Sequence, residues 1–134
     1  MVMEITTPRS IFVAGSNLAG RHGLGAALHA RKYYGAQYGV GVGRTGDAYM
    51  IPTKDENLKT LSIDRIRPYV KDFIQYAKDH PELEFNVTRV GCGLAGYNDK
   101  DMAPLFYGAP DNCLFVKEWD LILKEIEDNL SRRE

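Results

Sequence analysis

The chain has 134 residues, of which 44% are hydrophobic and 26% are charged, and its net charge is −1. This length is enough for one domain with a real core, and the small net charge excludes a basic field that would hold nucleic acid nonspecifically. No run of roughly 18 apolar residues predicts a membrane span, and no basic-then-apolar start predicts a secretory signal. We therefore expect one cytoplasmic domain over residues 1–134, with no membrane partner.

The first half of the chain predicts three strands and one helix. Ile11–Ala14 is an apolar run typical of a short buried strand, and Leu24–Tyr34 has apolar positions at helical spacing that end at Gly35. Gln37–Val42 alternates with glycines and is expected as an irregular strand. Ala48–Pro52 is a second apolar run and predicts a further strand.

An amphipathic helix is expected next, beginning after Ser62, whose hydroxyl suits a helix N-cap. His80-Pro81 ends this helix, because the residue before a proline is restricted away from helical geometry. Phe85–Val90 then predicts a strand, and Asn98 or Asp99 can cap a short helix. The apolar stripe of the long helix consists of Ile63, Ile66, Val70, Phe73, Ile74 and Ala77.

The C-terminal part predicts a last strand over Cys113–Val116 and an amphipathic helix over Trp119–Asn129, with a frayed tail at Ser131–Glu134. Strands that alternate with helices favour an α/β fold, here a three-layer α/β/α sandwich with a mixed central sheet. Ligands in such folds bind beyond the carboxyl ends of the strands.

Two glycine-rich loops fall at such strand ends. Gly15–Ala27 follows the first apolar strand, Arg89–Tyr97 follows a later one, and a helical run comes after each loop. Glycines let the backbone approach phosphate, and the free N–H groups of a helix start point toward it. Two such loops predict a pocket that holds a diphosphate from both sides. The first loop lacks the dinucleotide fingerprint, and the chain has no P-loop Gly-Lys-Ser/Thr.

Three polar side chains near these loops can carry chemistry. Asn17 suits sugar hydroxyls or caps a turn, and His22 is either a site residue or a solvated loop residue. Lys54 follows a strand end, where its amine can attack a sugar carbon or simply face solvent. Cys92 and Cys113 have no metal spacing and are expected as reduced thiols. We expect no metal and no cofactor.

Together the loops resemble macrodomains, the ADP-ribose-binding fold, over roughly Ile11 to Val116. Macrodomain first loops have an asparagine and then a glycine-rich turn into a helix, as Asn17 and His22–Ala27 do. Their second loops read Gly-x-Gly-x-x-Gly before an aromatic or apolar residue, as in Gly91–Tyr97. Ile51–Lys54 is similar to the subgroup that removes ADP-ribose from glutamate or from DNA bases, which includes the antitoxin of a DNA-modifying toxin pair.

The resemblance implies that the ligand is ADP-ribose or an ADP-ribosylated macromolecule, bound by an ADP-ribosyl glycohydrolase or by a non-catalytic reader or sensor. It places Asn17 and Tyr97 at the distal ribose and Lys54 at the anomeric carbon, so that Lys54 and Asn17 are the candidate catalytic residues. The implied ligand-binding residues are Gly15, Ser16, Asn17, His22, Gly23, Leu24, Gly25, Ala26, Thr53, Gly91, Cys92, Gly93, Leu94, Ala95, Gly96 and Tyr97.

Several positions differ from the family pattern. Ser10 stands near the position where many macrodomains have an aspartate that binds the adenine amino group, and Ala14 replaces an asparagine. Ala95 stands where one related hydrolase has an acid, so a lysine mechanism needs another acid, Asp99 or Asp55, or none. The chain is also short for a macrodomain, and we expect a peripheral element to be missing.

Two further readings stay open. The run Phe12–Ser16 is similar to the start of phosphoribohydrolase-like Rossmann proteins, which sense or cleave nucleotides. Those proteins pair this start with a Pro-Gly-Gly-x-Gly-Thr loop, which this chain does not contain, so this reading ranks below the macrodomain one. The other is a structural protein that keeps a decayed pocket.

Overall fold

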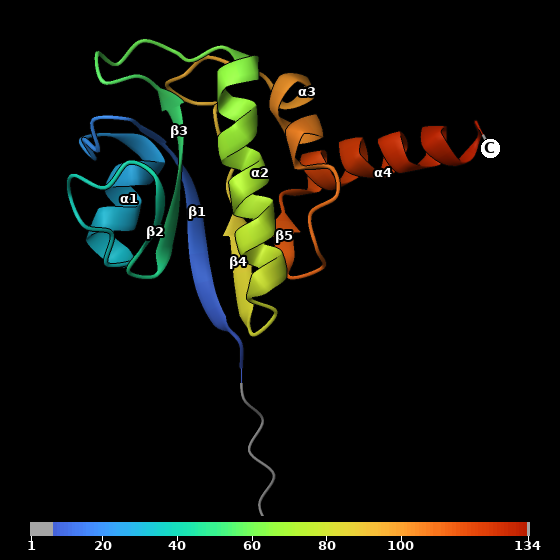
Figure 1. Cartoon of the computed structure of the whole chain (residues 1–134), viewed down its shortest axis with the longest axis horizontal. Coiled ribbons are helices and arrows are strands. Elements are labelled where there is room, and N and C mark those ends of the chain that lie inside the picture. Colours follow the sequence, from blue (N-terminus) through green and yellow to red (C-terminus); the bar gives the residue numbers. More distant parts are fainter. Residues whose placement is uncertain (1–6, 134) are drawn as a thin grey trace, which may run out of the picture.

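The computed structural model describes residues 7–133, which form a five-stranded mixed sheet with helices on both faces (Figure 1). The spatial order of the strands is β2-β3-β1-β4-β5. Strand β1 runs parallel to β3 and β4, β4 runs parallel to β5, and only the edge strand β2 is antiparallel to its neighbour. The strands are β1 (Arg9–Asn17), β2 (Gly43–Thr45), β3 (Ala48–Lys54), β4 (Leu83–Val87) and β5 (Cys113–Phe115).

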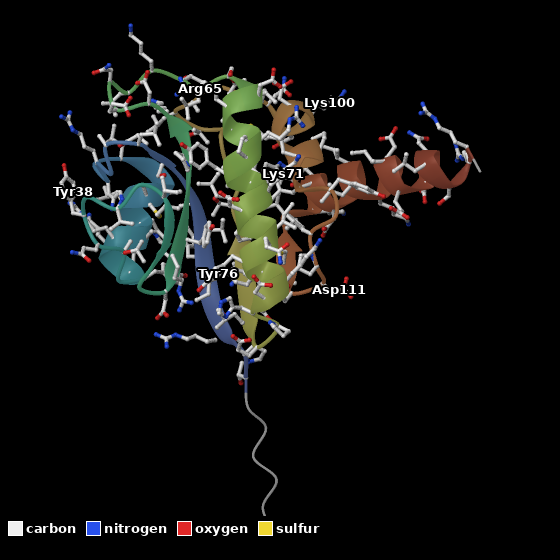
Figure 2. All side chains as sticks on the ribbon, in the orientation of Figure 1. Tyr38, Arg65, Lys71, Tyr76, Lys100 and Asp111 are labelled. Atoms are coloured by element: carbon white, nitrogen blue, oxygen red, sulfur yellow. The ribbon has the colours of Figure 1, made fainter. Side chains whose placement is uncertain are left out.

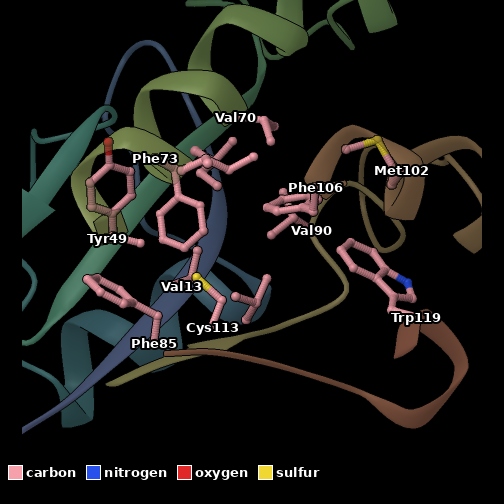
Figure 3. Close-up of a cluster of buried hydrophobic side chains, with 14 of the residues drawn as sticks. Val13, Tyr49, Val70, Phe73, Phe85, Val90, Met102, Phe106, Cys113 and Trp119 are labelled. Carbon is pink, nitrogen blue, oxygen red and sulfur yellow. The ribbon is translucent and has the colours of Figure 1, made fainter. Parts of the chain in front are cut away.

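The helices form the two outer layers. Helix α1 packs its alanines on one face of the sheet, against Ala14 and Met50. Helix α2 and the 3-10 helix η1 cover the other face with a larger aromatic core that includes Phe73, Phe85 and Phe106 (Figure 3). This confirms the expected three-layer α/β/α sandwich. The helices are α1 (Gly25–Tyr33), α2 (Ile63–Asp79), α3 (Asp99–Met102), η1 (Ala103–Phe106) and α4 (Lys117–Ser131).

Helix α2 forms where its sequence signals place it. The Ser62 side chain accepts a hydrogen bond from the backbone N–H of Arg65 and so satisfies one free donor of the first turn. The helix ends at Asp79, just before His80-Pro81. The apolar stripe faces the sheet, and its members from Ile66 to Ala77 are buried. In the same way, Asn98 caps α3 with a reciprocal capping box to Asp101.

Two predicted strands differ from the structure. The segment 37–42 is not a strand, because it turns back onto the first glycine-rich loop, where the Gly39 N–H donates to Gly20 O (2.8 Å). Strand β4 starts at Leu83 and ends at Val87, earlier than predicted. The reason is a tight turn in which the Val90 N–H donates to Thr88 O (2.7 Å), so the chain leaves the sheet before Gly91.

Helix α4 extends away from the rest of the molecule (Figure 1). Its first turn is anchored by Trp119, which is fully buried, while Leu121 and Leu130 farther along are exposed. The helix runs through Ser131, so the predicted tail begins one residue later, and Glu134 lies outside the described residues. Within residues 7–133, no helix combines the length and the apolar character needed to cross a bilayer.

Candidate functional site

Three parallel strands end at the same edge of the sheet, and the loops that follow them enclose a cleft of about 690 Å³. Strand β1 ends at Asn17, β3 at Lys54 and β4 at Val87. The tertiary structure therefore brings both glycine-rich loops and the lysine segment to one site. The predicted residues that line it are Gly15, Ser16, Asn17, Gly23, Leu24, Gly25, Ala26, Thr53, Lys54, Gly91, Cys92, Gly93, Leu94 and Ala95.

Backbone amides with no internal partner are concentrated on these loops. Within residues 7–133, the N–H groups of Gly23 and Leu24 in the first loop find no acceptor, nor do those of Gly93, Leu94 and Ala95 in the second. Main-chain donors that line a cleft without a partner are ready to bind an anion. The first helical turn of α1 lies beside them and adds the positive end of its dipole.

Two glycines of the second loop have different roles. Gly91 has a φ of +79°, and a Cβ atom built there would lie 2.9 Å from the Met102 side chain, so this position requires glycine. Gly93 does not have a positive φ, and a Cβ atom there would meet no heavy atom within 4 Å. Gly91 therefore shapes the loop, whereas Gly93 leaves open space beside the free amides.

The charge of the cleft is positive. Arg21, Lys54 and Arg89 line it, and of the described residues no aspartate or glutamate does. Basic side chains in a concave site raise the local concentration of anions, although an ion pair with Asp99 partly offsets the charge of Arg89. The cleft therefore combines free N–H donors with basic side chains, as a phosphate-bearing ligand requires.

Asn17 takes part in the structure of the first loop. Its side-chain amide donates to Arg21 O (2.9 Å) and accepts from the Arg21 N–H (3.0 Å), so it closes the turn that the sequence allowed as one interpretation. One amide hydrogen and one lone pair remain for a ligand. Asn17 is nearly buried at the end of β1 and pairs in register with Lys54. The two candidate catalytic residues thus lie side by side.

Neither acid proposed as a partner for Lys54 lines the cleft. The Asp55 carboxylate accepts the N–H groups of Asn57 (2.8 Å) and Lys59 (3.0 Å), and these bonds hold its pKa below the ordinary value. Asp99 is engaged by Arg89 and by the Trp119 indole, which lower its pKa in the same way. Both carboxylates therefore stay ionised and serve the loops that hold them.

Cys92 lines the cleft as a free thiol. Burial, together with the nearby Asp99 carboxylate, raises the pKa of this thiol to about 11. The thiol therefore remains protonated near neutral pH and presents a weak donor rather than a nucleophile.

Three predicted site residues lie outside the lining of the cleft. His22 is fully buried rather than solvated, because its Nε2 bonds to Val40 O (2.8 Å) and its ring packs edge-on against Tyr38. Tyr97 turns away, since its hydroxyl donates to Leu61 O (2.6 Å), and Gly96 precedes it in the turn that closes the loop. The structure therefore does not place Tyr97 over a ribose in the cleft.

Several lining residues had no signal strong enough to single them out. Tyr38 belongs to the turn after α1 and lies at the outer side of that helix (Figure 2). It lines the cleft only because tertiary folding brings this turn beside the first loop. The Arg31 guanidinium lies over the Tyr38 ring, 5.4 Å from its centroid. Arg21 and Arg89 belong to the glycine-rich segments and could have been found from the charge within them. The other lining residues are Ala27, Leu58, Thr88 and Val90.

Comparison with known proteins gives the fold and no activity. No protein-family model matches the chain, and no curated protein matches it. A solved structure of a protein of unknown function from Bacteroides thetaiotaomicron is similar, with a TM-score of 0.55 and 17% identity, over 75% of this chain and 80% of that one. At this identity the likeness supports the α/β fold alone.

Proposed function

We propose that the cleft binds ADP-ribose and that the chain is a macrodomain-like module. The observation that carries this proposal is the arrangement of free loop amides on both sides of one cleft, with three cations and no lining carboxylate among the described residues. A diphosphate needs donors on two sides, and the sugars and base need adjoining volume. About 690 Å³ lies within the range of small-molecule sites.

We also propose that Lys54 releases ADP-ribose from a modified protein or nucleic acid. The neutral amine would bond to the anomeric carbon while the bond to the acceptor breaks. The acceptor would leave with the electron pair of that bond and take up the proton that the amine gives up. Water would then cleave the carbon–nitrogen bond, returning the amine and giving free ADP-ribose. Asn17, beside Lys54 in the sheet register, would orient the distal ribose.

A second candidate is a reader that binds ADP-ribose without turnover. It is favoured by the lining of the cleft, in which none of the described carboxylates can act as a general base. Asp55 and Asp99 already have other partners. For either function we propose a cytoplasmic location, because the two free cysteines are typical of a reducing compartment.

Calorimetric titration with ADP-ribose tests the binding proposal. Gly93→Val should lose affinity, because a branched side chain would fill the open space beside the free amides of the second loop. Gly23→Val tests the first loop in the same way, since a Cβ atom there also meets no heavy atom within 4 Å. Circular dichroism checks that both variants fold. Unchanged affinity in both would remove the proposed phosphate site.

Release of ADP-ribose from modified protein and modified DNA then separates the two candidates. Single-turnover assays with wild-type protein should show cleavage of one substrate if the chain is a hydrolase. Tight binding of ADP-ribose with no cleavage of either substrate would identify a reader.

A further inference from the structure

An ion pair joins Arg89, the first residue of the second glycine-rich loop, to Asp99 just beyond the end of that loop. Arg89 donates from Nε to one oxygen of Asp99 (2.8 Å) and from Nη2 to the other (3.0 Å), so the pair is bidentate. The Trp119 indole donates to the same carboxylate (2.7 Å) from the buried start of α4. Trp119, Asp99 and Arg89 thus form one hydrogen-bonded chain from α4 to the cleft.

Arg89 has unused capacity at the cleft. Its guanidinium carries five N–H donors, and the contacts to Asp99 use two of them. The side chain is about half exposed, and the residue lines the cleft next to the second loop. A planar guanidinium held at two points has already lost its rotamer freedom, so a ligand need not order it on binding.

We propose that Arg89 is an anion-binding residue of the cleft and that Asp99 is its positioning residue, itself held by Trp119. The inference rests on the proposed function in that the ligand carries phosphate. Arg89 would donate its remaining N–H groups to a phosphate oxygen while its bonds to Asp99 stay in place. The free amides of Gly93 and Leu94 would bind the same group from the loop.

The proposal and simple electrostatics predict opposite changes in anion affinity when the charge of Asp99 is removed. A carboxylate near an anion site repels the anion, so removing the charge of Asp99 should strengthen binding if only charge matters. If Asp99 positions Arg89, the same substitution should weaken binding, because the guanidinium loses its two-point anchor. Asp99→Asn therefore distinguishes the two effects, since the asparagine oxygen can still accept from Trp119.

Calorimetric titration with inorganic pyrophosphate tests the proposal. Arg89→Ala should lose roughly tenfold in affinity, and Asp99→Asn several-fold. The double variant should bind as Arg89→Ala does, because Asp99 acts through Arg89. Arg67→Ala is the matched control, since Arg67 also pairs with an aspartate but does not line the cleft, and it should bind as wild type does.

An independent readout comes from the single tryptophan of the chain. Because its indole N–H bonds to Asp99, pyrophosphate bound at Arg89 should change Trp119 emission in wild-type protein and not in Arg89→Ala. Thermal melts confirm that each variant is folded. Trp119→Phe keeps a ring in the core and removes the N–H, so its affinity should fall less than that of Asp99→Asn.

Three results would overturn the inference. Asp99→Asn could bind pyrophosphate more tightly than the wild type, or Arg89→Ala could bind it with wild-type affinity. The third is a double variant that binds more weakly than Arg89→Ala, which would mean that Asp99 acts independently of Arg89. Parallel titrations with ADP-ribose separate this failure from that of the proposed function. If wild-type protein binds ADP-ribose and Arg89→Ala binds it equally well, only the role of Arg89 is lost. If pyrophosphate binding needs Arg89 but ADP-ribose does not bind, only the proposed function is lost.

Discussion

Asn17 and Lys54 are neighbours in the sheet but differ in how far their side chains support the backbone of the site. The Asn17 side chain makes two hydrogen bonds to the loop backbone, so any substitution there should disturb the loop as well as contacts to a ligand. Lys54 ends β3, where its carbonyl accepts from the Leu18 N–H (3.0 Å) and thereby fixes the backbone beneath the side chain. Its side chain can therefore be removed with little effect on the architecture of the cleft.

If the chain is a hydrolase, Lys54→Ala should lose turnover and keep most of its affinity for ADP-ribose. The reason is that the diphosphate grip acts in the ground state, whereas the amine acts only on the reacting carbon. Single-turnover release of ADP-ribose measures the first and calorimetry the second. Lys59→Ala, an exposed lysine of the same loop that does not line the cleft, is the control. Equal cleavage by Lys54→Ala and wild type would show that another group carries the chemistry.

Gly91 and Gly93 should respond differently to the same small substitution. Gly91→Ala forces a Cβ atom against Met102 at a positive φ, so it should destabilise the protein by more than about 1 kcal/mol. Gly93→Ala meets no neighbour and should stay within about 0.5 kcal/mol of wild type. Urea unfolding of both variants checks this, and similar losses would contradict the structural role assigned to Gly91.

Among the elements, α2 and α4 differ in how much of their apolar surface they bury. Phe73 of α2 is fully buried between Tyr49, Phe85 and Phe106. Phe73→Ala should therefore destabilise the protein by about 3–5 kcal/mol. Leu121→Ala in α4 removes a mostly exposed side chain and should change stability by less than about 0.5 kcal/mol. Chemical denaturation of both variants tests whether the core depends on α2 as the packing indicates.

We expect the buried thiol of Cys113, in strand β5, to make the folded protein less stable at alkaline pH. Burial raises the pKa of the Cys113 thiol from its ordinary 9.0 to about 12. Above pH 9 the unfolded chain therefore loses this proton while the folded chain keeps it, so stability falls as pH rises, by at most about 1.4 kcal/mol per pH unit. Cys113→Ala should show a shallower decline between pH 9 and 10 in denaturation curves. An unchanged slope would mean that the thiol titrates equally in both states.

The whole molecule offers one ligand test that needs no variant. If the cleft binds ADP-ribose as we propose, the ligand would contact both loops and the end of β3 at once, so it should raise the melting temperature more than AMP or ribose phosphate. At a hundredfold excess over its dissociation constant, binding adds about 2.7 kcal/mol to the stability of the folded state. Thermal scans with each ligand check this ranking. Equal shifts from AMP and ADP-ribose would favour a nucleotide sensor.

Local patterns predicted much of this architecture. The α2 stripe, its Ser62 cap and the Asn98 cap are each decided by residues within a few positions of one another, and all three were confirmed. The alternation of strands and helices gave the α/β class for the same reason, because each element forms from its own periodicity. The position of both glycine-rich loops after parallel strands followed from that class.

Contacts distant in sequence decided the rest. Segment 37–42 has a strand-like pattern, but Gly39 donates to Gly20 and Gly41 accepts from Ser16, which lies 25 residues away. The turn is therefore fixed by partners that are distant in sequence. The same packing buries His22 and brings Tyr38 to the cleft. Tyr97 leaves the cleft because its hydroxyl reaches Leu61. The sequence by itself determined the α/β class, most of the helices and strands, and the phosphate-loop hypothesis, but not the edge strand β2. Only the tertiary structure decided which side chains face the cleft, because that depends on which long-range partner satisfies each polar group.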